Sequence, residues 1–218
     1  GAASARGGSV NISGGLLDGD FGNNIYGGYA QSSNGNAVAE ANSVVLDGTA
    51  SLNVEKYIYG GYAQGNGSAA RRVAARYNEI SLGNGTVENI YGGYANDGPE
   101  FNGVLLAVEN SVLVTGGTVT NVVYGGKADS DFDNTVYSRA DRNLVTVTGG
   151  TLEILYGGKA DSDIDASADG NIVEISGKSL DVLRQVQEVS PLHWHFLTSG
   201  SSEEEGGVLL PAERRECA

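Results

Sequence analysis

Short runs in which apolar and polar residues alternate recur along the chain, and Gly, Asn or Asp bound each run. Alternation with a period of two is typical of a strand with one buried face, and the bounding residues favour tight corners. In five of these runs an Asn stands two positions before the first apolar residue. The runs are Val44–Leu46, Ile80–Leu82, Val112–Val114, Val145–Val147 and Val173–Ile175, with Val10–Ile12 as an earlier member.

A Tyr-Gly-Gly tripeptide occurs five times at nearly constant spacing, and its tyrosines are separated by 33, 32, 33 and 32 residues. An apolar residue precedes each tyrosine, and Ala follows it four positions later. Between that Ala and the next Asn lies a further apolar patch, so each repeat is predicted to hold three short strands. The tyrosines are Tyr26, Tyr59, Tyr91, Tyr124 and Tyr156. The further patches are Val38–Ala41, Val73–Arg76, Val104–Val108 and Val136–Ala140.

A three-stranded repeat of this length cannot bury its own apolar face, so we expect the copies to stack on one another. The sequence therefore predicts an all-β protein, a parallel β-solenoid (β-helix) of repeats of 32–33 residues that spans residues 1–180. Equivalent residues would lie ~4.8 Å apart in neighbouring coils, so the tyrosines and the asparagines would each form a column. The alternative is a propeller or prism built from separate three-stranded units.

Two sets of corner residues have expected roles in such a stack. Gly pairs permit a positive φ or a close approach of backbone, and Asn side chains can hydrogen-bond from coil to coil. The period ends near Gly177, and we interpret residues 181–218 as a C-terminal closing rung or cap with a tail. An uncovered solenoid edge would pair with another chain, so self-association through the edges is a further expectation.

Composition narrows the classes of partner. The 27 acidic and 13 basic residues give a net charge of −14, which argues against nucleic acid as a partner. The single cysteine, Cys217, excludes an intrachain disulfide and a thiolate metal site. No stretch approaches the ~18 apolar residues of a membrane-spanning helix, so we expect no transmembrane segment.

The repeat unit is an Asn followed by an alternating run, Gly-Gly-Thr, then an apolar residue, Tyr-Gly-Gly, Tyr or Lys, and Ala. Its clearest copies are Asn110–Ala128 and Asn143–Ala160. This unit resembles the passenger repeats of bacterial autotransporters, the type V secreted surface proteins, over Gly8–Leu180. The resemblance implies a β-helical segment that is secreted or displayed at the cell surface, with an outer-membrane anchor in the full-length parent. It implies a scaffold or an adhesin for a host surface, glycan or protein ligand, and no catalytic residue.

Tyrosine also recurs three positions after the first three motif tyrosines, at Tyr29, Tyr62 and Tyr94, and Lys127 and Lys159 follow at the same offset. If the motif tyrosines face inward, residues three positions later face outward, unless the Gly pair resets the alternation. Stacked outward tyrosines form a surface that suits sugar rings or a partner protein, so these three are the candidate ligand-binding residues. The alternative is that they cover the Gly backbone at corners.

Two acidic segments stand at the same offset from the last two motif copies. Oxygen ligands at alternate positions suit Ca²⁺, so the segments are candidate metal ligands. The alternative is a solvated acidic loop beside the two lysines. The candidate ligands are Asp129, Asp131, Asp133, Asp161, Asp163 and Asp165.

No hydrolase nucleophile motif occurs in the chain, and no catalytic residue is predicted. The alternative function is a carbohydrate-active enzyme, a β-helical lyase or hydrolase whose acidic groove uses calcium. An open groove that gathers Asp with Lys or Arg would distinguish this enzyme from a binding protein.

Overall fold

A computed structural model describes residues 1–13, 24–47, 53–67, 71–130, 136–162, 165–176, 185–186 and 195–196. These residues form strands joined by turns and loops. Within these ranges, no helix has the length and apolar character needed to cross a membrane.

The strands form three parallel sheets, which we call A, B and C. Sheet A contains β1 (Ala3–Arg6), β4 (Ala37–Glu40), β7 (Arg72–Arg76), β10 (Val104–Val108), β13 (Tyr137–Arg139) and β16 (Asp165–Ser167). Sheet B contains β2 (Ser9–Ile12), β5 (Ser43–Leu46), β8 (Glu79–Leu82), β11 (Ser111–Val114), β14 (Leu144–Val147), β17 (Ile172–Ile175) and β19 (His195–Phe196). Sheet C contains β3 (Ile25–Ser32), β6 (Asn53–Gly65), β9 (Thr86–Asp97), β12 (Thr118–Asp129), β15 (Thr151–Asp161) and β18 (Gln185–Val186).

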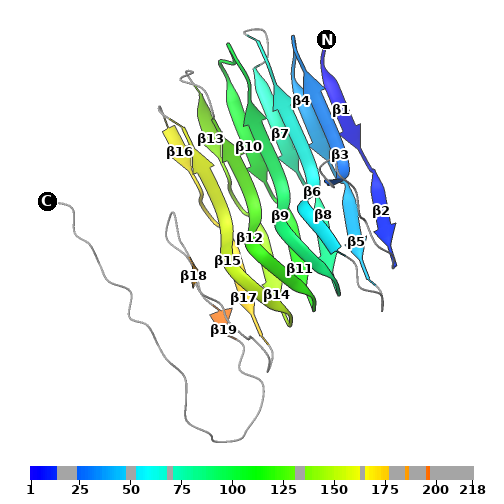
Figure 1. Cartoon of the computed structure of the whole chain (residues 1–218). Helices are drawn as coiled ribbons and strands as arrows, with labels where there is room; N and C mark the ends of the chain where they lie inside the picture. The colour runs from blue at the N-terminus through cyan, green and yellow to red at the C-terminus, as the bar shows by residue number, and fades with distance from the viewer. Residues whose placement is uncertain are drawn as a thin grey trace, which may run out of the picture.

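The predicted parallel solenoid is confirmed. Each strand pairs in parallel with the equivalent strand of the next coil, and all three sheets continue from coil to coil (Figure 1). The register joins the five motif tyrosines into one column, in the order Tyr26, Tyr59, Tyr91, Tyr124 and Tyr156. Separate three-stranded units, as in a propeller or prism, are excluded because each of the three sheets that the structure describes runs through successive repeats.

The strands of sheet C are longer than expected for a repeat of three short strands. β6 contains 13 residues and β9 contains 12, and both pass through the Tyr-Gly-Gly motif without interruption. The register between them shifts between Val54 and Tyr57, where the ladder is irregular. A single strand of sheet C therefore spans the width of the coil and faces both other sheets.

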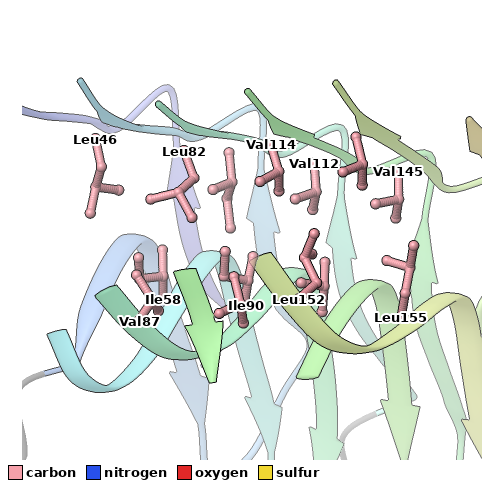
Figure 2. Close-up of a cluster of buried hydrophobic side chains, with 14 of the residues drawn as sticks. Leu46, Ile58, Leu82, Val87, Ile90, Val112, Val114, Val145, Leu152 and Leu155 are labelled. Carbon is pink, nitrogen blue, oxygen red and sulfur yellow. The ribbon is translucent and has the colours of Figure 1, made fainter. Parts of the chain in front are cut away.

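The core has two parts that follow from this arrangement. One part is formed by aliphatic side chains of sheet B and of the first half of sheet C. In Figure 2 the row of Leu46, Leu82 and Val114 faces the row that contains Ile58 and Ile90. The other part lies between sheet A and the second half of sheet C and consists largely of alanine. Small side chains allow these two sheets to approach closely.

A buried column of asparagines occupies the corner between sheets A and B. Its members are Asn42, Asn78, Asn110, Asn143 and Asn171, each at most 8% exposed. The Asn110 side-chain Nδ2 donates to Asn143 Oδ1 at 3.0 Å and to the Ala75 carbonyl at 3.1 Å. The same pattern repeats between successive coils, so the expected hydrogen bonding of amides from coil to coil is confirmed.

The Gly pair of each motif provides the space for this column. A Cβ added to Gly93 would lie 2.4 Å from Asn110 Nδ2, and one added to Gly61 would lie 2.5 Å from Asn78 Nδ2. Neither glycine has a positive φ, so close approach is the reason for glycine here. The left-handed conformation instead occurs at the residue before each Asn. These residues are Ala41, Tyr77, Glu109, Arg142 and Gly170.

Two short strands, β18 and β19, are described within the range predicted to form a C-terminal rung or cap, which stays a prediction. β18 pairs with β15 of sheet C, and β19 pairs with β17 of sheet B. The other residues of the predicted cap and tail, 181–218, lie outside the described residues.

Candidate functional site

The motif tyrosines lie on the outer face of sheet C. Ile25 and Ile58, which precede Tyr26 and Tyr59, point into the core, so the tyrosines point away from it. The expectation that the motif tyrosines face inward is therefore wrong. The Gly pair turns two consecutive positions toward the Asn column and resets the alternation, so Tyr29 lies on the same outer face as Tyr26.

Two adjacent columns of tyrosine cover this outer surface. In the first column, the ring centroids of successive motif tyrosines are 5.0, 5.0, 5.2 and 4.8 Å apart, and the rings are stacked. In the second column, Tyr29 and Tyr62 are stacked at 5.1 Å, and Tyr62 contacts Tyr94 at 5.2 Å. We call this surface the tyrosine face, and it consists of Tyr26, Tyr29, Tyr59, Tyr62, Tyr91, Tyr94, Tyr124 and Tyr156.

In the first two coils the two columns pack edge to face. The Tyr26 and Tyr29 rings meet at 76°, with centroids 5.3 Å apart, and the Tyr59 and Tyr62 rings meet at 78° and 5.2 Å. In the third coil Tyr94 instead meets Tyr62 of its own column at 64° and stacks on Tyr59 of the other column at 17°. Stacked and edge-to-face contacts are both favourable arrangements of aromatic rings. A ring that is stacked on both sides offers a ligand mainly its edge and its hydroxyl group.

Exposure varies within each column, and Tyr26, Tyr91 and Tyr156 of the first column are half-buried. Tyr59 and Tyr124 of the first column are only 7% and 9% exposed, whereas Tyr29 of the second is 47% exposed. Tyr62 and Tyr94 are half-buried. The structure thus brings the three predicted ligand-binding residues, Tyr29, Tyr62 and Tyr94, together on one outer face, supported from the side by the motif tyrosines.

A polar column borders the tyrosine face and was not identified from the sequence. Gln31 donates through Nε2 to Gln64 Oε1 at 2.9 Å, and Gln64 donates to Asn96 Oδ1 at 3.3 Å. Asp129 and Asp161 continue the column in the next two coils. The available signal was the constant offset of five positions from each motif tyrosine, where all five residues are polar.

The character of the face changes along the solenoid axis. In the second column Lys127 replaces tyrosine, and its Nζ lies 5.3 Å from the centre of the Tyr94 ring and pairs with the Asp129 carboxylate. The Tyr94 hydroxyl donates to Asp129 Oδ2 at 3.2 Å and accepts from Asn96 Nδ2 at 3.1 Å. The first three coils therefore present neutral hydroxyls and amides, and the next coil presents paired charges.

Packing also fixes the protonation of the phenols. Burial, reinforced by neighbouring tyrosines, raises the pKa of Tyr59 and Tyr91 far above the ordinary value. Burial, with smaller contributions from Tyr156 and Asp129, raises the pKa of Tyr124 to about 12. These hydroxyls therefore stay neutral near pH 7 and can both donate and accept hydrogen bonds.

The predicted calcium ligands are only partly described. Asp129 and Asp161 are neighbours in the register of sheet C, whereas Asp165 belongs to sheet A and pairs with Arg139 at 2.6 Å, which lowers the pKa of its carboxyl. Within the described ranges no three His, Cys, Asp or Glu side chains form a metal-binding group. The remaining candidates, Asp131, Asp133 and Asp163, lie outside the described residues. The calcium site stays a prediction, which melting with and without a chelator tests.

Comparisons with known proteins returned no match, whether against protein-family models, curated proteins or solved structures. The function is therefore inferred from the geometry of the tyrosine face and its polar border.

Proposed function

We propose that this chain is a binding segment of a secreted or surface-displayed bacterial protein of the autotransporter passenger type. In this proposal the solenoid is the scaffold and the tyrosine face is the adhesive surface, with a host-surface glycan as its ligand. The observation that carries the proposal is the two-column array of tyrosines with an amide column along its border.

A glycan fits the chemistry of this array better than a charged polymer. Over the first two coils, sugar hydroxyls would meet phenol hydroxyls together with the amides of Gln31 and Gln64, and in the third coil the buried Asn96 supports Gln64 from below. Each group recurs once per coil, so a chain of sugars along the solenoid axis would meet the same contacts repeatedly. Weak contacts that repeat in this way add up to useful affinity.

The surface location is supported by the repeat unit and by the net charge. The unit that resembles autotransporter passengers places Asn and Tyr-Gly-Gly at a fixed distance, and the fold uses both, because the Gly pair makes room for the Asn column. The net charge of −14 favours a solvated protein at a surface rather than one that binds anionic polymers.

Binding of the purified chain to cultured epithelial cells tests the proposal. We expect the triple substitution of Tyr29, Tyr62 and Tyr94 to Ala to abolish binding without unfolding the solenoid, because Tyr29 is largely exposed and the other two lie at the outer surface. The matched control is Tyr77→Ala with Tyr137→Ala, since these tyrosines are 47% and 44% exposed but lie outside the tyrosine face. The control variant should bind like the unchanged protein.

Removal of glycans from the cells distinguishes the ligand classes. Binding that disappears after glycosidase treatment identifies a glycan, and binding that survives this treatment but not protease identifies a protein ligand. Equal binding by the triple variant and the unchanged protein would place the adhesive surface elsewhere.

A further inference from the structure

The second column of the tyrosine face places two phenols from different coils in direct contact. Tyr29 and Tyr62 are register partners in β3 and β6, their ring centroids are 5.1 Å apart and their planes differ by 9°. Tyr29 is 47% exposed, so an oxidant in solution can reach its ring. Tyr77 has the same exposure but lies in no tyrosine column.

We propose that Tyr29 and Tyr62 are an oxidative modification site, at which a one-electron oxidant joins the two rings as an intramolecular dityrosine. The link would connect the first two copies of the Tyr-Gly-Gly repeat covalently across the outer face of sheet C. This modification is independent of ligand binding by the face.

The reaction balances with hydrogen peroxide as the oxidant, acting through a haem peroxidase. Each phenol loses one electron and one proton and becomes a phenoxyl radical. The two radicals form a carbon–carbon bond between ring positions ortho to the oxygens, and the displaced ring hydrogens return to the oxygens by tautomerisation. One peroxide molecule accepts the two electrons and two protons and becomes two molecules of water.

Tyr29 and Tyr62 differ from the other pairs of the tyrosine face in the freedom of their rings to rotate. Coupling requires the rings to turn so that their ortho carbons meet, and the exposed Tyr29 can turn into solvent. Tyr59 and Tyr124 in the first column are 7% and 9% exposed and are held between stacked neighbours, so they lack this freedom. The fixed register keeps Tyr62 beside Tyr29 throughout the lifetime of a radical, whereas Tyr77 would have to meet another molecule.

The test treats the dilute chain with a haem peroxidase and hydrogen peroxide, isolates the monomer and digests it with trypsin. Cleavage after Lys and Arg places Tyr29 in peptide 7–56 and Tyr62 in peptide 57–71. We expect a species whose mass is the sum of these two peptides minus two hydrogens, with the fluorescence of dityrosine. Tyr29→Phe and Tyr62→Phe should each remove most of this species, whereas Tyr77→Phe should leave it unchanged.

Phenylalanine keeps each ring, so the variants retain the packing of the face. Absence of the joined peptides from the oxidised monomer would overturn the proposal. A joined species that persists in Tyr29→Phe would also overturn it, because Tyr26 would then be the linked residue of peptide 7–56. Dityrosine confined to dimers would show that exposure alone decides which phenols couple.

Discussion

The buried asparagines are the residues on which neighbouring coils depend most directly. Each side chain of the column lies at the corner between sheets A and B, and all but the last, Asn171, bond to the coils on both sides. In the first coil Gly8 takes the equivalent place, and its backbone N–H donates to Asn42 Oδ1 at 2.9 Å. Buried polar groups are costly unless their partners are present, so the column ties each coil to the next in one register.

Replacement of Asn110 by Ala should therefore destabilise the protein strongly. The change removes the donor to the Ala75 carbonyl and the acceptor of the Asn78 backbone N–H, and it leaves Asn78 Nδ2 with only the Ala39 carbonyl. We expect the free energy of unfolding to fall by about 3 kcal/mol, measured by denaturant titration. The exposed Asn102 provides the control, and Asn102→Ala should change stability little. Equal effects of the two substitutions would show that the column does not hold the coils together.

Because the Gly pair packs against the Asn column, the effects of Gly93→Ala and Asn110→Ala on stability should depend on each other. A Cβ on Gly93 would lie within 2.6 Å of three side-chain atoms of Asn110, so Gly93→Ala should cost about 2 kcal/mol. Combined with Asn110→Ala, the loss should be smaller than the sum by about 1 kcal/mol, because the obstructing side chain is gone. Gly83→Ala is the control, since its nearest neighbour lies at 3.3 Å on a flexible side chain. Strict additivity would argue against the close approach.

At the scale of elements, the long strands of sheet C create the candidate site. The first half of each strand packs in the aliphatic core, and the second half packs in the alanine core. The outer side of the strand carries the tyrosine face. The bend at the Gly pair brings two tyrosines of one strand to the same side. A regular strand would place residues at an odd offset of three on opposite faces.

The strands and their stacking could be predicted from the sequence, whereas the side-chain directions around the Gly pair could not. The period and the alternating runs were enough to predict the strands, the parallel stacking and the columns of Tyr and Asn. The outward direction of Tyr26 was not predictable from alternation, because it depends on how the Gly pair packs against Asn42 in another strand. The bordering column of Gln31 and Gln64 was visible only as an offset that repeats, without a motif of its own.

The packing of the first tyrosine column predicts a loss of stability at alkaline pH. The pKa of Tyr124 is raised from 10.0 to about 12, so between these values the unfolded chain has released a proton that the folded chain retains. The free energy of unfolding should therefore be unaffected by this group below pH 10 and should fall above it, by about 1.4 kcal/mol per pH unit for each such phenol. Denaturant titrations from pH 9 to 12 measure this decline. Tyr124→Phe, which removes the hydroxyl and keeps the ring, should make it shallower, and an unchanged slope would contradict a buried phenol.

At the scale of the whole molecule, repetition turns a small recognition unit into an extended surface. Each coil contributes one position to every column, so the tyrosine face lengthens with the number of repeats while its local chemistry stays constant over the first three coils. The change to Lys127 and Asp129 in the next coil gives the face a charged end. A ligand that lies along the axis would therefore meet neutral contacts first and a fixed ion pair at one end.

The central claim is that the hydroxyls of the tyrosine face recognise a glycan, and a glycan array measures this most directly. The unchanged chain should bind a restricted set of glycans. The triple variant with Tyr29, Tyr62 and Tyr94 changed to Phe should lose that binding and stay folded, because the rings and their packing remain while the hydroxyls are gone. Its melting temperature should fall only by the loss of the Tyr94 hydroxyl bonds to Asp129 and Asn96. Undiminished binding by the Phe variant, or no glycan bound by the unchanged chain, would contradict the claim.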